Sequence, residues 1–149
     1  MPIKTQQEPA EIMKVVLDTN VVYSALYSKN GASYKILTTI LAQETVITCI
    51  SVSLICEYEA VLKRQFDHYF IDQFLRSYID CSEKILIAYR YRPTGCDDKD
   101  EMVLEAAINA PADYLITHNV KDFKGAKSFN LEVVTPQQFL NVLKEINHG

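Results

Sequence analysis

The sequence predicts an α/β protein with a central, mostly parallel sheet that is covered by helices on both faces. Short aliphatic or β-branched runs alternate along the chain with longer stretches whose apolar residues recur every three or four positions. This alternation is typical of parallel sheets, because two parallel strands need a crossover connection between them. The run Val15–Leu17 has no polar alternation and stops at Asp18, as expected for a strand that is buried on both faces.

The elements follow from the same periodicities and from turn and cap residues. Strands are expected at residues 14–17, 45–49, 84–89, 114–117 and 131–134. Helices are expected at residues 19–28, 32–43, from Ser51 or Ser53 to 64, 71–81, 98–110 and from 136 onward. Thr135 is the expected cap of the last helix, and Pro136 takes its first position. The stretches 90–96 and 118–130 are expected to be loops.

Length and composition indicate one folded domain. A chain of 149 residues with 48% hydrophobic residues is long enough to bury a core. Residues 1–13 are expected to be a flexible extension and 14–149 the domain, and Met13 is a candidate for the true start. Nothing apolar is long enough to span a membrane or to act as a secretion signal, so a cytoplasmic protein with four reduced cysteines is expected.

The charge limits the classes of function. A net charge of −4 argues against unspecific nucleic-acid binding, but carboxylates that hold divalent cations are consistent with it. The three histidines are far apart in sequence, which argues against a histidine-rich zinc site. An oxygen-ligand site for a cation such as Mg²⁺ remains, if several of the acids converge.

Asp18 is the first candidate ligand, because α/β sheets place their ligands at the carboxyl ends of strands. Three further acids, Asp97, Asp98 and Asp100, open the helix expected at 98–110; they act either as caps or as cation ligands. At about 100° per residue, Asp100 lies on the margin of the apolar stripe. Glu101 and Glu105 lie nearly opposite that stripe and are expected to face water.

Two other sets of residues are ambiguous from spacing. Glu57 and Glu59 flank the apolar stripe of their helix at equal angles, so periodicity does not choose between them, and each is equally a surface acid. After the fourth strand come Thr117, Asn119 and Asp122, which serve either a pocket or an ordinary turn. His118 is expected to be a surface or hydrogen-bonded histidine.

Basic residues stand near the later acids in sequence. Arg90 and Arg92 precede Asp97, while Lys121, Lys124 and Lys127 surround Asp122. They are candidates to bind phosphate groups, or they belong to solvated loops.

Five stretches together resemble the PIN-domain family, more narrowly the bacterial branch of toxin components, the VapC-like ribonucleases. They are VVLDTNVVYSAL at 15–26, SLICEYEAVLKR at 53–64, DDKDEMVLEAA at 97–107, ADYLITHNVKDF at 112–123 and VVTPQQFL at 133–140. The resemblance spans residues 14–143. It implies a three-layer α/β/α sandwich with a central parallel sheet of five strands, and an acidic pocket that binds Mg²⁺ or Mn²⁺ and cleaves RNA phosphodiesters.

The resemblance also implies roles for individual residues. Asp18, Glu57 and Asp100 would be the catalytic metal ligands, with Glu57 preferred to Glu59. Further metal ligands would be Asp97 and Asp122, and supporting residues Asn20, Thr117 and Asn119. The RNA phosphates on either side of the cut would be held by Arg90, Arg92, Lys121 and Lys124. Many family members carry an Asp at the position of Asn119, so this departure bears on a second metal ion.

The family also implies a homodimer and often a small antitoxin that covers the pocket. A PIN-like nucleic-acid-binding or RNA-processing protein with a weakened metal site is the alternative. Two other doubly wound classes do not fit. A receiver domain needs an Asp after its third strand, and 85–90 has none; a haloacid-dehalogenase-type phosphatase needs an Asp where Asn20 stands.

Overall fold

A computed structural model describes residues 12–42, 45–88 and 98–148. Five strands form one sheet in the order β3-β2-β1-β4-β5, and every neighbouring pair is parallel. The strands are β1 (Met13–Leu17), β2 (Val46–Ile50), β3 (Glu83–Lys84), β4 (Tyr114–Ile116) and β5 (Glu132–Val134). The predicted α/β class and parallel sheet are confirmed.

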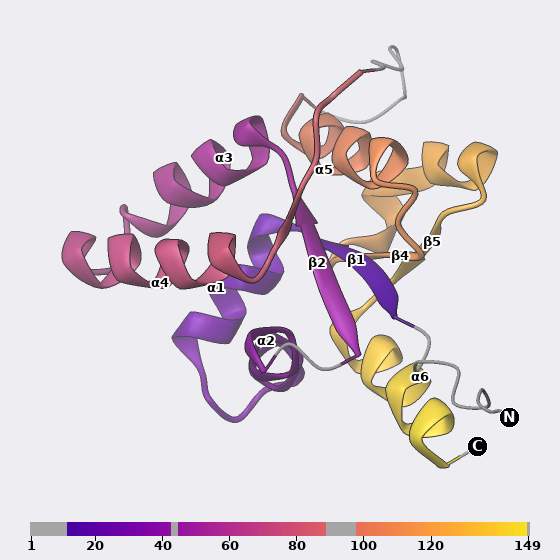
Figure 1. Cartoon of the computed structure of the whole chain (residues 1–149), viewed down its shortest axis with the longest axis horizontal. Coiled ribbons are helices and arrows are strands. Elements are labelled where there is room, and N and C mark those ends of the chain that lie inside the picture. The colour runs from indigo at the N-terminus through magenta and orange to yellow at the C-terminus, as the bar shows by residue number, and fades with distance from the viewer. Residues whose placement is uncertain (1–11, 43–44, 89–97, 149) are drawn as a thin grey trace, which may run out of the picture.

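Helices cover the sheet on both faces, as an all-parallel sheet requires. On one side α5 packs on β1, β2 and β4; on the other α2 packs on β2 and contacts α1 and α6 (Figure 1). The α-helices are α1 (Thr19–Tyr27), α2 (Ala32–Leu41), α3 (Val52–Leu62), α4 (His68–Asp80), α5 (Asp98–Asn109) and α6 (Pro136–His148).

Strand β1 lies in the centre of the sheet. Its residues Val15, Val16 and Leu17 are at most 1% exposed. It pairs with β2 on one side and with β4 on the other, so the end of β1 is fixed by both neighbours. The residue that follows, Asp18, therefore sits at a well-defined place at the carboxyl edge of the sheet.

Side-chain caps set the starts of several helices. Ser51, the first of two candidates, caps α3: its Oγ accepts a hydrogen bond from the Leu54 amide at 3.1 Å. Thr135 accepts from the amide of Gln138 at 3.2 Å ahead of α6, as predicted. Helix α4 begins at His68, three residues before the predicted start, because the carboxylate of Asp67 accepts from the Phe70 amide at 3.0 Å.

Two expectations about regular structure are corrected. The predicted strand 84–89 is only Glu83–Lys84, because β3 is an edge strand whose one neighbour, β2, ends at Ile50. The stretch after β4, predicted as a loop, contains 3₁₀ turns named η2 (Val120–Phe129).

The expectation that Glu101 and Glu105 face water is wrong. These side chains are 6% and 5% exposed. The angular argument assumes that α5 has one buried face, but α5 contacts α3 and η2 as well as three strands of the sheet. A helix that is enclosed on several sides buries residues opposite its main apolar stripe.

None of the helices within the described ranges has the length and apolar character needed to cross a bilayer. Cys49 and Cys56 are free thiols, whereas Cys96 and the predicted extension up to residue 11 lie outside the described residues. Met13, assigned to that extension, is the first residue of β1.

Candidate functional site

Asp18 directly follows β1 and is the N-cap of α1. One carboxylate oxygen accepts a hydrogen bond from the amide of Thr19 at 2.7 Å, and the other accepts from the hydroxyl of Thr117 at 2.7 Å. Thr117 directly follows β4, the neighbour of β1, and is fully buried. The two strand ends thus fix the orientation of a carboxylate that is only 7% exposed.

Burial raises the pKa of Asp18, since a low-polarity environment disfavours the charged form. The hydrogen bonds from Thr117 and Thr19 act in the opposite direction and lower it. The negative charge of Asp122 adds a smaller increase, and His118 a smaller decrease. A cation bound beside Asp18 would offset the cost of burying its charge.

Asp18 opens onto a pocket of about 300 Å³. Two further carboxylates reach the same pocket: Glu57 from α3 and Asp100 from α5, both half-buried. Three acids that are far apart in sequence therefore meet at the carboxyl end of β1. The complete lining is Asp18, Thr19, Asn20, Tyr23, Glu57, Val61, Lys99, Asp100 and Asn119.

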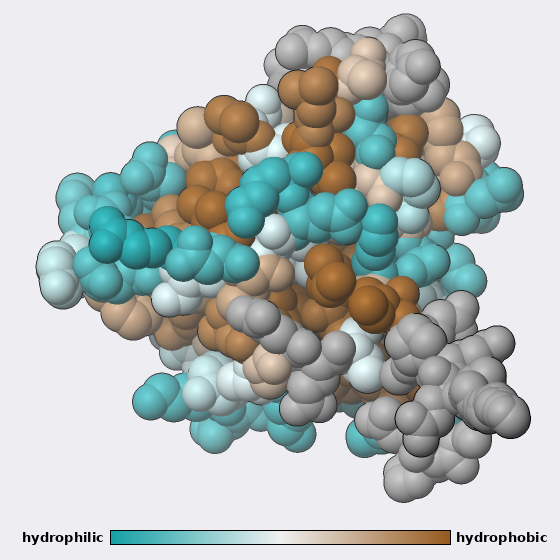
Figure 2. Space-filling model, in the orientation of Figure 1, coloured by the Kyte–Doolittle hydropathy of each residue, from teal (hydrophilic) through white to brown (hydrophobic). Residues whose placement is uncertain are grey.

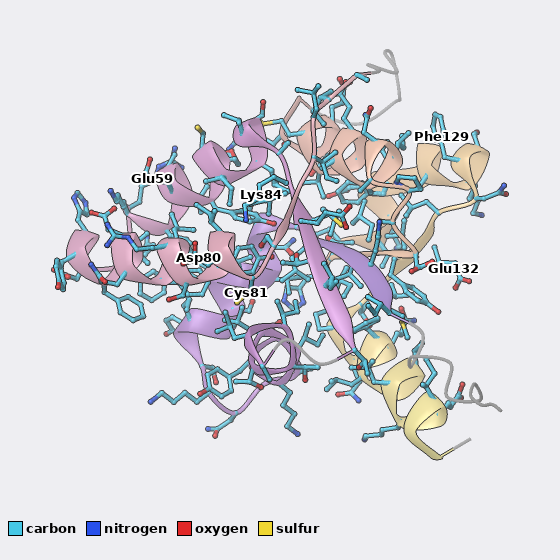
Figure 3. The ribbon with its side chains drawn as sticks, viewed as in Figure 1. Glu59, Asp80, Cys81, Lys84, Phe129 and Glu132 are labelled. Atoms are coloured by element: carbon cyan, nitrogen blue, oxygen red, sulfur yellow. The ribbon has the colours of Figure 1, made fainter. Side chains whose placement is uncertain are left out.

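The two glutamates of α3 have different surroundings. Glu57 lines the pocket, whereas Glu59 lies at a groove between α3 and α4 and forms an ion pair with Lys63 at 3.1 Å (Figure 3). Figure 2 shows hydrophobic surface between these helices beside the hydrophilic side chains of α4. The structure thus separates two residues that helical periodicity leaves equivalent.

Contacts of two buried tyrosines fix the rotation of α3 about its axis. Tyr58, next to Glu57, is fully buried and donates to the carbonyl of Leu17 at the end of β1. Its ring meets that of Tyr78 edge-on at 5.9 Å, and the Tyr78 hydroxyl lies 2.7 Å from that of Thr48 in β2. These contacts join α3 to the residue before Asp18, which keeps Glu57 directed to the pocket.

The residues predicted to support the acids lie around Asp18. The hydroxyl of Thr117 also accepts from the Asn119 amide at 3.0 Å. The side-chain oxygen of Asn20 accepts from the His118 amide at 3.3 Å. The His118 ring lies 3.0 Å from the hydroxyl of Ser24, in keeping with the surface or hydrogen-bonded role expected of it.

Other predicted residues either do not line the pocket or lie outside the described part of the chain. Asp122, Lys121 and Lys124 are exposed on η2 and do not line it, although the charge of Asp122 reaches Asp18. Lys127 is also exposed on η2. Asp97, Arg90 and Arg92 lie outside the described residues.

Sequence reasoning missed four residues of the pocket, Thr19, Tyr23, Val61 and Lys99, of which Tyr23 and Lys99 bring chemistry of their own. Lys99 brings a positive charge beside Asp100, and Tyr23 brings an aromatic ring. The signal for Lys99 was its place between two of the acids that open α5. Tyr23 shares its helical face with apolar residues, so its spacing does not distinguish it from a core residue.

Among the described residues, the acids of the pocket are three carboxylates, and the amides of Asn20 and Asn119 add neutral oxygen atoms. Within the described parts of the chain, no three acidic, histidine or cysteine side chains form a group that would hold a metal ion as they stand. Mg²⁺ is bound in proteins by one or two carboxylates and keeps several waters. The donor set therefore fits a divalent cation that prefers oxygen ligands and is held partly through water.

The order of the strands and this acidic pocket define a doubly wound α/β protein with its site at the carboxyl end of the sheet. Residues 14–121 match the family model of the PIN domain. The match covers more than half of the chain, and the chain belongs to the PIN-domain family. The resemblance seen in the sequence is confirmed. No curated protein matches the sequence.

Solved structures share the fold at low sequence identity. VapBC2 from Rickettsia felis, bound to a DNA fragment from its promoter, is 18% identical with a TM-score of 0.59, over 83% of this chain and 98% of its own. VapBC-1 from nontypeable Haemophilus influenzae is 15% identical (TM-score 0.56; 84% and 99%). PAE2754 from Pyrobaculum aerophilum is 13% identical (TM-score 0.55; 90% of each chain).

Proposed function

We propose that this PIN-domain protein is a metal-dependent endoribonuclease that hydrolyses RNA phosphodiesters as the toxin of a toxin–antitoxin pair. The observation that carries the proposal is the meeting of Asp18, Glu57 and Asp100, from three separate elements, in one pocket. Carboxylates repel one another unless a cation lies between them. Mg²⁺ or Mn²⁺ is the cofactor that this donor set favours.

Each residue of the pocket has a task in this proposal. Asp18, oriented by Thr117 and Thr19, would hold the cation together with Glu57 and Asp100. A bound divalent cation supplies a water of lowered pKa and compensates the charge of the phosphate. Lys99, exposed at the rim, would contact a phosphate of the RNA.

The proposal also includes predicted residues that do not belong to the described lining of the pocket. They are the predicted metal ligands Asp97 and Asp122 and the predicted RNA contacts Arg90, Arg92, Lys121 and Lys124. The four basic residues would add affinity for the phosphates of the RNA chain, whereas Asp97 and Asp122 would add negative charge that favours a second cation. Their contribution is electrostatic, so it weakens as the salt concentration rises.

The proposal includes a protein partner, a homodimer and a cytoplasmic location. VapBC2 and VapBC-1, which share the fold, support a search for an antitoxin. A small protein encoded beside this one should co-purify with it and inhibit RNA cleavage. Sedimentation of the purified chain would report the homodimer.

The two glutamates of α3 give a matched test. Glu57→Gln should abolish Mg²⁺- or Mn²⁺-dependent cleavage of single-stranded RNA, because it removes one carboxylate from the pocket. Glu59→Gln removes a carboxylate from the same helix outside the pocket and should leave cleavage unchanged. Cleavage by Glu57→Gln at the wild-type rate would contradict the assignment of the site.

One observation favours the second candidate, a PIN-like nucleic-acid-binding or RNA-processing protein with a weakened metal site. Asn119 places a neutral amide at the pocket, where many family members have a carboxylate. Calorimetric titration with Mn²⁺ separates the two. Binding that is lost in Glu57→Gln supports the nuclease, and the absence of binding to the wild type supports the second candidate.

A further inference from the structure

Three aromatic rings form a continuous row beside the acidic pocket. Tyr23 and Tyr27 are one turn apart on α1, and their rings are stacked with centroids 5.9 Å apart and planes 14° apart. The Tyr23 ring also meets that of Phe66, at 5.5 Å between centroids and 57° between planes. Tyr23 is therefore braced by two rings, and Tyr27 forms the outer end of the row.

The row begins at the site and ends in solvent. Tyr23 lines the pocket together with Asp18, Glu57 and Asp100. Tyr27 is 74% exposed, so it contributes little to the core. A turn of helix rises about 5.4 Å, which carries the row along α1 away from the carboxylates by about one turn.

We propose that Tyr27 and Tyr23 form a stacking platform for unpaired bases of single-stranded RNA next to the phosphate at the pocket. Every nucleobase has a π-face that stacks on an aromatic ring, whatever its identity. The bases of a duplex are stacked on one another and cannot reach such a ring, so the platform selects single strands. The inference rests on the proposed nuclease function, whose substrate class it narrows.

The chemistry around the row favours RNA over a protein partner. The row leads to a pocket lined by three carboxylates and Lys99, the groups that act on a phosphodiester and its cation. An apolar protein segment would find these charges at the inner end of the row. A nucleotide presents a base to the rings and a phosphate to the pocket.

The chain contains no tryptophan, which makes a fluorescence test possible. Tyr27→Trp in an Asp18→Asn background introduces one reporter and prevents cleavage. An unstructured oligoribonucleotide should quench this tryptophan through stacking, and the same strand in a duplex should not. Tyr69→Trp is the matched control, because Tyr69 is 73% exposed on α4 and does not line the pocket.

Measurements of RNA binding and of kcat provide a second test of the platform. Tyr27→Ala should weaken binding of single-stranded RNA by about fivefold to a hundredfold, the range found when one stacking ring is removed, with kcat little changed. Tyr27→Phe keeps the ring and should retain wild-type affinity. Tyr69→Ala should bind as the wild type does.

The outcomes separate the platform from the nuclease. If Tyr27→Ala binds and cuts RNA like the wild type, or if duplex quenches the reporter equally, the platform is wrong while the nuclease proposal stands. If the reporter is quenched by single strands but the wild type cuts no RNA, the nuclease proposal fails and the platform stands. If Tyr27→Ala loses only a protein partner, the row belongs to that partner and the inference is overturned.

Discussion

The two ends of the sheet carry hollows of very different size and chemistry. At the amino end, a hollow of about 900 Å³ is lined by Asp113, Phe129, Glu132 and Ile146, of which Figure 3 labels Phe129 and Glu132. At the carboxyl end, the acidic pocket has a volume of about 300 Å³. The smaller hollow is the candidate site, so volume does not identify it.

The two ends differ in the burial of their carboxylates and in the groups that these carboxylates contact. Asp113 is exposed, and its carboxylate accepts a hydrogen bond from the backbone amide of Lys14 at 2.9 Å, which ties two strands together. Asp18 is buried, and its pKa is raised by that burial. The exposed acid serves the fold, whereas the buried acid has an energetic cost that a cation can offset.

The difference between the two ends of the sheet is tested most directly by neutralising one aspartate at each end. Asp18→Asn should lower kcat/KM for RNA cleavage by at least about a hundredfold, because ligand loss exceeds the effect of losing a supporting hydrogen bond. Asp113→Asn should retain nearly full activity. Cleavage assays in Mg²⁺ would measure both, and equal losses would show that the carboxyl end is not special.

The next largest effect is expected at Thr117, which orients Asp18. Thr117→Val keeps the shape but removes the hydroxyl, and should weaken Mn²⁺ binding by about tenfold to a hundredfold. Thr117→Ser restores the donor and should restore most of the affinity. Thr38→Val, at an exposed site on α2, is the calorimetric control. Unchanged Mn²⁺ affinity in Thr117→Val would show that this hydroxyl does not orient Asp18 for metal binding.

A measurement of stability at Tyr58 tests the carboxyl end of the sheet alone, because Tyr58 anchors α3 to the end of β1. Tyr58→Phe leaves the carbonyl of Leu17 without this donor and should lower the free energy of unfolding by about 1–3 kcal/mol. Tyr69→Phe, at an exposed position, should change it by less than about 0.5 kcal/mol. Urea unfolding monitored by circular dichroism gives both values, and equal values would contradict the anchoring role.

The smallest effect is a pH dependence that comes from Asp18. Its pKa is raised in the folded chain, so its stabilising contribution is complete below the unfolded value near 3.8 and is lost as pH rises through the folded value. In chelator, the free energy of unfolding of the wild type should therefore fall relative to that of Asp18→Asn over this window. Mn²⁺ should reverse the difference, because the cation binds the charged form. Parallel pH curves for the two proteins would contradict this account.

The sequence predicts the fold well because its strongest signals are local. Val15–Leu17 followed by Asp18 predicts a buried strand with an acid at its carboxyl end, and the structure has both. The third strand was overestimated because its length depends on β2, a distant partner that ends at Ile50. Pairing between distant segments leaves no trace in local periodicity.

The site is less predictable for the same reason. Glu57 and Glu59 are equivalent on a helical wheel, and only packing against β1 and α4 separates them. Glu101 and Glu105 were expected in water because a wheel recognises one buried face, whereas several elements enclose α5. Tyr23 lines the pocket because of where α1 lies after Asp18, and residue spacing alone does not predict that position.

The hydrogen bond between Asp18 and Thr117 joins residues that are 99 positions apart in the chain. During synthesis on the ribosome, β1 emerges early but cannot find β4 until most of the chain has been translated. Contacts of such long range form late in folding. A nascent fragment that ends before Thr117 therefore lacks the oriented carboxylate, and under the proposed function it would not yet cleave the messenger that is still being translated.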